Sequence, residues 1–282
     1  HSLNLVKTKY VMLFDNDDFP IKYSIDKCLS KLEDRKDLIG CGGYLINFDI
    51  FNKTSNSKKF FLGGNAINLS KINYGTNYTN SNNIDRVSLF LTKKKHTNTI
   101  NDIFRTKILR NNYKVLKDLK FDYVFFYYLV GDILNYFSGK IMKLKLPFVV
   151  HQHHSTSLSM KMKNVYESLN EKKFLDQKKI LYKTLNKQLK KKEINDLLDK
   201  YFYSLIIKSK IYNLKFHNNI KKKEKRKSHN LNEFYKMNYK ILKYNYLKFN
   251  NMHVNKFIKL YKNKKILKLE INEIFNFIKK YN

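Results

Sequence analysis

Apolar runs and their spacing predict an α/β fold at the start of the chain. The run KYVMLF, residues 9–14, is bounded by Asp and Asn and predicts a short buried strand. The segment PIKYSIDKCLSKLED, residues 20–34, predicts an amphipathic helix with Pro20 in its first turn and Asp18 as its N-cap. Its apolar positions recur at helical spacing: Ile21, Ile25, Cys28, Leu29 and Leu32.

Further strands and helices follow. Residues 38–51 predict a strand pair with glycines at the bend, and the polar residues 52–83 predict a long loop. Residues 105–119 and 123–137 predict helices. The segment KLPFVVHQHHSTS, residues 145–157, predicts a strand that runs into a polar loop.

The second half of the chain predicts long helices. All eight glycines and both prolines lie at or before Pro147, and these residues mark turns. Residues 165–192 and 200–214 have helical periodicity with Lys on the outer face. We therefore predict an α/β domain over residues 1–160, followed by an all-helical, Lys-rich region over residues 161–282.

Positive charge concentrates in that helical region. The net charge of the chain is +34, and residues 148–282 hold 33 Lys and Arg against 10 Asp and Glu. Such a charge suggests nucleic acid or an anionic membrane as a partner. Enrichment in Lys, Asn, Ile, Tyr and Phe without Trp is also typical of an AT-rich genome. We favour this compositional explanation and expect no specific nucleic-acid partner.

Cysteine content and hydropathy bear on location. Cys28 and Cys41 form no CxxC pair, so the sequence supports neither a zinc site nor a disulfide framework. A reduced, cytoplasmic setting fits best. No apolar run approaches the roughly 20 residues of a membrane span. Peripheral contact of the basic helices with the inner face of a membrane is compatible with both observations.

An acidic turn follows the first strand. Asp15, Asp17 and Asp18 lie where open α/β sheets place their ligands, at the carboxyl end of a strand. Crowded carboxylates repel one another, and a divalent cation relieves that repulsion. Hard oxygen ligands suit Mg²⁺ or Mn²⁺. The simpler interpretation is a polar turn with a helix cap, although a cap needs one carboxylate and this turn has three.

Three kinds of metal turn compete. An EF-hand loop requires further ligands and a glycine at set positions, which DNDDFPIKYSID does not supply. Phosphatases of the haloacid dehalogenase type want Thr or Val where this chain has Phe19. Nucleotide-sugar transferases use Asp-x-Asp to hold a metal on the donor diphosphate.

Two other groups of residues could carry chemistry. His151, His153 and His154 follow the predicted strand near residue 150 and could bind metal or phosphate. Asp122 and Asp132 stand in an apolar surround, where burial would raise a carboxylate pKa and suit a general base. The alternative for the histidines is a polar surface loop, and the alternative for Asp122 is a helix cap.

The order of these motifs resembles the family 2 glycosyltransferases of GT-A fold. The resemblance spans roughly residues 3–160. It rests on TKYVMLFDNDDFP, followed by a helix, a glycine-containing strand, an acid before a helix ending in GK, and finally PFVVHQHHSTS. The variant looks like bacterial glycosyltransferase-domain proteins of surface polysaccharide synthesis. It implies a GT-A-like fold, a partial Rossmann-like sheet with flanking helices.

The resemblance also implies roles for individual residues. Asp15 and Asp17 match the Asp-x-Asp, with Asp15 at the donor ribose or the metal and Asp17 on the metal. Asp18 matches a frequent third acid that places the acceptor or caps the helix. His153 matches a late histidine that contacts metal or diphosphate, with His154 as the alternative. Asp122 matches the catalytic base, and Asp132 is the alternative.

The expected activity is a metal-dependent, inverting transfer of a sugar from a nucleotide-diphosphate donor to a hydroxyl acceptor on a glycan or lipid-linked molecule. Mn²⁺ or Mg²⁺ would neutralise the leaving diphosphate. Family members begin with further β/α units that bind the nucleotide base, and we expect that portion to be lacking here. The rival hypothesis is a non-catalytic basic helical protein that binds RNA or an anionic membrane.

Overall fold

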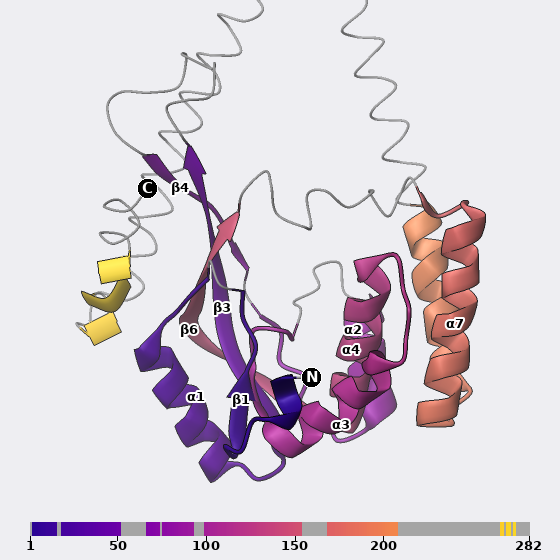
Figure 1. Ribbon diagram of the computed structural model, residues 1–282. Helices are drawn as coiled ribbons and strands as arrows, with labels where there is room; N and C mark the ends of the chain where they lie inside the picture. The colour runs from indigo at the N-terminus through magenta and orange to yellow at the C-terminus, as the bar shows by residue number, and fades with distance from the viewer. Residues whose placement is uncertain are drawn as a thin grey trace, which may run out of the picture.

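The computed structural model is a mixed α/β fold with helices on both sides of a curled sheet (Figure 1). It describes these residues: 2–15, 18–51, 66–73, 75–92, 99–153, 168–207, 266–267, 269–271 and 273–274. Of residues 48–51, 66–73, 152 and 153, the backbone alone is described.

The described strands form one mixed sheet. Its order is β1 (Tyr10–Met12), β5 (Ile103–Arg105), β3 (Leu38–Phe51), β6 (Lys140–His153) and β2 (Phe19–Pro20). A further strand, β4 (Ala66–Asn73), pairs with β3 outside this path. β3 and β6 run parallel, whereas the other pairs are antiparallel.

Alternating side chains of the central strands serve two cores. Leu38 packs with Cys28 and Leu32 of α1 (Lys22–Asp34) on one face of the sheet. The next residue, Ile39, belongs to the cluster on the other face, as expected from the two-residue period of a strand. Figure 1 shows α1 on one side of the sheet and α2, α3 and α4 on the other.

The second face is covered by α2 (Asn83–Thr92), α3 (Thr106–Lys117) and α4 (Val124–Ser138). Outside them lie α7 (Lys172–Leu189) and a helix over residues 193–207. The rings of Phe126 on α4 and Phe174 on α7 are 4.8 Å apart between centroids. The Lys-rich helices therefore share a hydrophobic core with the α/β part of the chain.

Several predicted elements are confirmed, and others differ. The helices expected over residues 105–119 and 123–137 are α3 and α4. Residues 38–51 form a single strand and not a pair, because the whole of β3 pairs with its neighbours. The loop predicted over residues 52–83 was wrong in part, since it contains β4, whose partner is remote in sequence. β1 is half-buried at the sheet edge and is not a fully buried strand.

The predicted helix start was also wrong. The first helix begins at Lys22, and the residue at its N-cap is Ile21, which makes no side-chain cap bond. Pro20 lies in β2, opposite Val149, and not in the helix. Proline is tolerated there because β2 is an edge strand, where a missing N–H group costs little. The carboxylate of Asp18 is therefore not used as a helix cap.

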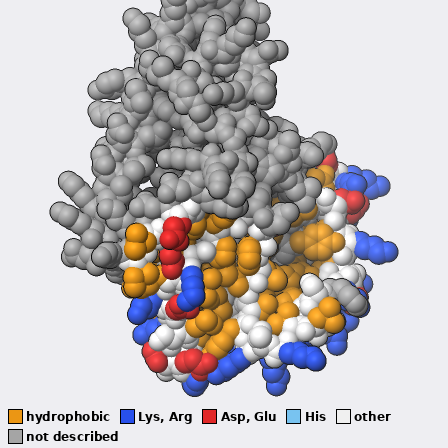
Figure 2. Space-filling model, turned by 60° about the vertical axis from the view of Figure 1, so that its left-hand side comes forward, with side chains coloured by type: hydrophobic (Ala, Val, Ile, Leu, Met, Phe, Trp, Pro, Cys, Tyr) orange, Lys and Arg blue, Asp and Glu red, His pale blue; other side chains and the backbone are white. Residues whose placement is uncertain are grey.

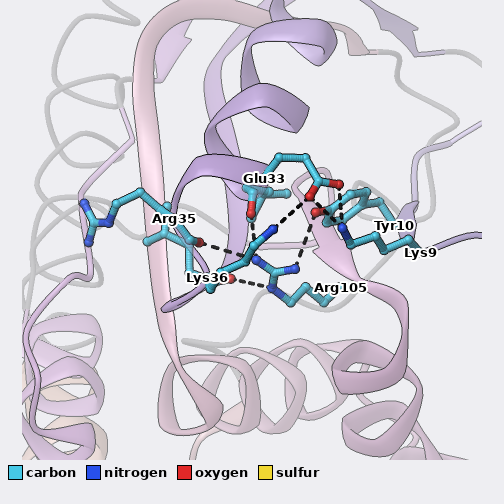
Figure 3. Close-up of polar contacts among 8 residues, drawn as sticks. Lys9, Tyr10, Glu33, Arg35, Lys36 and Arg105 are labelled. Carbon is cyan, nitrogen blue, oxygen red and sulfur yellow. Dashed lines mark hydrogen bonds and ion pairs between the residues drawn. The ribbon is translucent and has the colours of Figure 1, made fainter.

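A charged cluster fastens the start of β1 to α1 (Figure 3). The ammonium group of Lys9 lies 2.6 Å from a carboxylate oxygen of Glu33. Arg105 donates hydrogen bonds to the carbonyl oxygens of Leu38 and Leu32, at 2.8 and 2.7 Å. These contacts join β1, α1, β3 and β5 at the end of β1 that lies away from the acidic turn.

Within the ranges given above, no helix combines the length and the apolar character needed to cross a membrane.

Candidate functional site

The acidic turn and the histidine segment meet at the edge of the sheet. The Nδ1 atom of His151 lies 2.5 Å from Oδ1 of Asp18. The side chain of Asp18 is 1% exposed and that of His151 is 30% exposed. A buried carboxylate thus holds an imidazole whose ring is partly open to solvent.

The pairing of β2 with β6 explains this contact. Phe19 is opposite Val150, and Pro20 is opposite Val149, in an antiparallel register. Continuing that register by one residue brings Asp18 opposite His151. Two segments separated by more than 130 residues are therefore joined by the shortest strand of the sheet.

A third side chain completes the group. The Nδ2 atom of Asn101 donates a hydrogen bond of 3.0 Å to Oδ2 of Asp18. Both oxygens of this carboxylate therefore have partners, which is what a buried carboxylate requires. We call Asp18, Asn101 and His151 the Asp18 cluster.

Asp15 lies on the exposed side of the acidic turn. Its carbonyl oxygen accepts a 3.2 Å hydrogen bond from the backbone N–H of Asp18, which closes the turn. Burial, and then the negative charge of Asp15, raise the pKa of Tyr128 on α4. The acidic turn is thus within electrostatic range of α4. Asp17 lies outside the described residues.

The two candidate bases stand in different surroundings. Asp122 lies two residues before α4, and its carboxylate accepts a 2.6 Å hydrogen bond from Nε2 of Gln177. It also lies 3.2 Å from the ammonium group of Lys173, and its side chain is 56% exposed. Asp132 lies ten residues further along the chain, within α4.

Asp132 is buried within α4. Its Oδ1 accepts hydrogen bonds from the backbone N–H and the hydroxyl of Thr99, at 3.0 and 2.6 Å. Burial raises the pKa of Asp132 to about 6, and the bonds from Thr99 oppose that shift. Such a pKa would suit proton transfer near neutral pH, but the carboxylate is covered.

Three of the residues proposed to bind metal, Asp17, His153 and the alternative His154, have side chains outside the described part of the chain. The backbone of His153 pairs with Asp49 at the end of β6, and its side chain is outside the description. His154, like Asp17, falls outside the described residues. Where side chains are described, no three His, Cys, Asp or Glu residues gather closely enough to hold a metal ion.

The donor chemistry of the turn nevertheless fits a hard cation. Asp15 carries an exposed carboxylate beside the buried one of Asp18, and carboxylate oxygens are preferred ligands of Mg²⁺ and Mn²⁺. Because hydrogen bonds engage both oxygens of Asp18, a cation would depend on Asp15 and Asp17. Asp18 would then hold the turn in shape.

One member of the Asp18 cluster, Asn101, has no counterpart among the residues predicted from the sequence. His151 belongs to the predicted histidine segment, in which the resemblance gives the specific role to His153. Asn101 carries no sequence signal, since a single Asn in a polar loop is common. Only the position of Asn101 before β5, next to the acidic turn in space, reveals its contact.

Comparisons with known proteins add no assignment to this geometry. No protein-family model matches the chain, and no curated protein matches it at a significant level.

Proposed function

We propose that the chain carries the metal-dependent site of a glycosyltransferase of GT-A fold. It would transfer a sugar from a nucleotide-diphosphate donor to a hydroxyl acceptor, with inversion, during the synthesis of a surface polysaccharide in the cytoplasm. The observation that carries the proposal is the 2.5 Å contact between Asp18 and His151. This contact joins the two motifs on which the family resemblance depends, at one edge of a mixed α/β sheet.

In this proposal Asp15 and Asp17 hold Mn²⁺ or Mg²⁺, which neutralises the leaving diphosphate when bound. Asp18, held by Asn101, fixes the turn that presents these two carboxylates. His151, which Asp18 holds, would contact the diphosphate, and His153 keeps the role of metal or diphosphate ligand that the resemblance gives it.

The acceptor hydroxyl needs a base. Asp122 supports this role better than Asp132, because its side chain is 56% exposed while Asp132 is 6% exposed. A base must reach the proton that it removes. The ammonium group of Lys173, 3.2 Å from Asp122, places a positive charge next to this carboxylate.

Exposed aromatic rings flank the acidic turn. Phe14, immediately before Asp15, is 49% exposed, and Tyr128 on α4 is 40% exposed. Sugar rings and nucleobases pack well on such faces, so these two side chains are suited to hold part of a donor or an acceptor.

Mn²⁺-dependent binding of nucleoside diphosphates tests the proposal. Calorimetry on the intact gene product, with UDP, GDP and dTDP and with or without Mn²⁺, should detect binding that requires the metal. Asp17→Ala should abolish it and leave the circular dichroism spectrum unchanged. Failure of all three diphosphates to bind in the presence of Mn²⁺ would refute the proposed function.

The same experiment separates the rival hypothesis of a basic RNA- or membrane-binding protein. That hypothesis predicts salt-sensitive binding which Asp17→Ala does not alter. On the face drawn in Figure 2, Lys and Arg side chains are spread around the edge with Asp and Glu among them. A cavity of about 720 Å³ beside α7 is lined by Lys172, Lys178 and Lys179, but Asp176 and Asp199 line it too. Among the described residues, acidic side chains thus stand beside the basic ones on both of these surfaces.

A further inference from the structure

The turn formed by residues 99–102 lies between the Asp18 cluster and the protein core. The backbone N–H of Asp102 donates a 2.9 Å hydrogen bond to the carbonyl oxygen of Thr99, which closes the turn. Thr99 and Asp102 are 1% and 2% exposed, whereas Asn101 between them is half-buried. The turn thus has two buried ends and one side chain directed to Asp18.

Its first end is held by α4. Oδ1 of Asp132 accepts both the backbone N–H and the hydroxyl hydrogen of Thr99. Nδ2 of Asn135 donates a 2.8 Å hydrogen bond to the same hydroxyl oxygen. Asn135 in turn accepts a 2.9 Å hydrogen bond from Asn112 on α3. A chain of buried polar groups therefore fixes Thr99 against two helices.

Its second end is held by β6. The ammonium group of Lys143 lies 2.5 and 2.6 Å from the two carboxylate oxygens of Asp102. Gly42 on β3 leaves room for this carboxylate, because a Cβ atom at residue 42 would overlap Oδ1 of Asp102. Gly75 leaves room for the stem of Lys143 in the same way. Glycines in two separate segments thus make room for one ion pair.

A buried ion pair contributes little net stability, since the loss of hydration offsets the attraction between the charges. What it does provide is a defined geometry, which here is the position of the turn. The turn sets the amide of Asn101 3.0 Å from Oδ2 of Asp18, while Oδ1 of Asp18 faces His151.

We propose that Asn101 is a positioning residue of the acidic site, and that the buried contacts of Thr99 and Asp102 hold Asn101 in place. Asn101 sets the rotamer of Asp18, and through it the orientation of the ring of His151. The catalytic meaning of this inference rests on the proposed function, but the positioning itself is independent of it.

The Nδ1 proton between His151 and Asp18 provides a direct readout. A proton in a hydrogen bond this short resonates far downfield in ¹H NMR, and it exchanges with water slowly while Asp18 is held. His151→Gln identifies the signal by its loss. Asn101→Leu keeps the size of the side chain and removes the donor to Asp18. We expect proton exchange to accelerate about tenfold or more, because a hydrogen bond to a carboxylate is lost.

Two further variants complete the set. Thr99→Val removes the hydroxyl group that contacts Asp132 and Asn135 at the first end of the turn, and it leaves the ion pair between Lys143 and Asp102 in place. Exchange of the Nδ1 proton should accelerate in this variant too. Asn82→Leu is the matched control: it also removes an Asn hydrogen bond, the 2.8 Å bond to the backbone N–H of Ile84 at the start of α2. Exchange in this variant should equal that of the parent protein.

The outcomes separate the two proposals. If exchange is unchanged in both Asn101→Leu and Thr99→Val, with both folded by circular dichroism, the positioning role is overturned, whatever the diphosphate-binding experiment finds. If exchange accelerates while the parent protein binds no nucleoside diphosphate with Mn²⁺, the positioning role stands and the proposed function falls. If both hold, Asn101→Leu should also weaken Mn²⁺ binding, measured by electron paramagnetic resonance, and Asn82→Leu should not.

Discussion

The ammonium group of Lys143 on β6 lies 2.5 Å from the carboxylate of Asp102, and both side chains are almost fully buried, at 4% and 2% exposure. This ion pair connects the centre of the sheet to the turn that carries Asn101. Disturbing either partner therefore tests the stability of the fold and the support of the acidic site together.

Lys143→Met should destabilise the protein by about 3–5 kcal/mol, because it leaves the carboxylate of Asp102 buried without a partner. Urea unfolding followed by circular dichroism measures this change. Lys140→Met is the control, since the pair of Lys140 with Asp37 lies at the surface and should be worth about 1 kcal/mol or less. Equal losses in the two variants would contradict the distinction between these pairs.

Gly42→Ala should destabilise the protein by about 1–3 kcal/mol, because the new methyl group would displace Asp102 from its position next to Lys143. Gly131→Ala is the natural comparison. Gly131 lies within α4, and an added Cβ there would be 3.5 Å from its nearest neighbour, Leu116. That variant should gain about 0.5–1 kcal/mol from helix propensity. Thermal unfolding should thus move in opposite directions for the two variants.

The carboxyl group of Asp132 should make stability fall as pH rises from about 4 to 6. Burial raises its pKa in the folded protein from 3.8 to about 6, so the folded state binds more protons than the unfolded state in this interval. Asp132→Asn removes this dependence while keeping an acceptor for Thr99. Between pH 4 and pH 7 the parent should lose roughly 2–3 kcal/mol of unfolding free energy that the variant keeps. A constant difference across that range would show that Asp132 does not titrate as stated.

Glu33 should act in the opposite direction. Its contacts with Lys9 and then Lys36 lower its pKa from 4.5 to about 2 (Figure 3). The stability that this group contributes is therefore fully present above pH 4.5 and is lost as pH falls through 2. Glu33→Gln should be less sensitive to acid than the parent between these values. Because the group is at the surface, salt should reduce the difference, which acid titration at low and high ionic strength would reveal.

Asp122→Asn tests which acid is the base of the proposed transfer. If Asp122 removes the proton from the acceptor, kcat should fall by about 10²–10⁴ with little change in the affinity for the nucleoside diphosphate. The hydrogen bond from Gln177 is compatible with an Asn at this position, so the fold should persist. A large loss of kcat in Asp132→Asn but not in Asp122→Asn would assign the role to the buried acid.

The sequence predicted the regular elements well where local patterns dominate. The helical spacing of Cys28 and Leu32 located α1, and the apolar run before His151 located β6. It failed where pairing with a remote segment decides the structure. β4 lies in a segment rich in Asn and Ser and is a strand because β3 offers it hydrogen-bonding partners. Pro20 is extended because β2 pairs with β6.

The same division applies to the candidate site. The run of Asp residues and the row of histidines were visible as unusual local composition, and their order suggested one site. That Asp18 contacts His151, and that Asn101 is the third member, depends on the register of β2 with β6 and on the turn before β5. Residues this far apart in the sequence form no local pattern from which their contact could be predicted.

The sequence by itself determined the position of β1, the acidic turn after it, and the approximate positions of α1, α3 and α4. Hydrophobic periodicity and turn-forming residues act over a few positions, so a local pattern is enough for these elements. Only the tertiary structure decided which carboxylate is buried, which histidine meets it and why Lys143 faces Asp102. Those choices depend on strand register and on the space left by glycines, and both are set by contacts between distant parts of the chain.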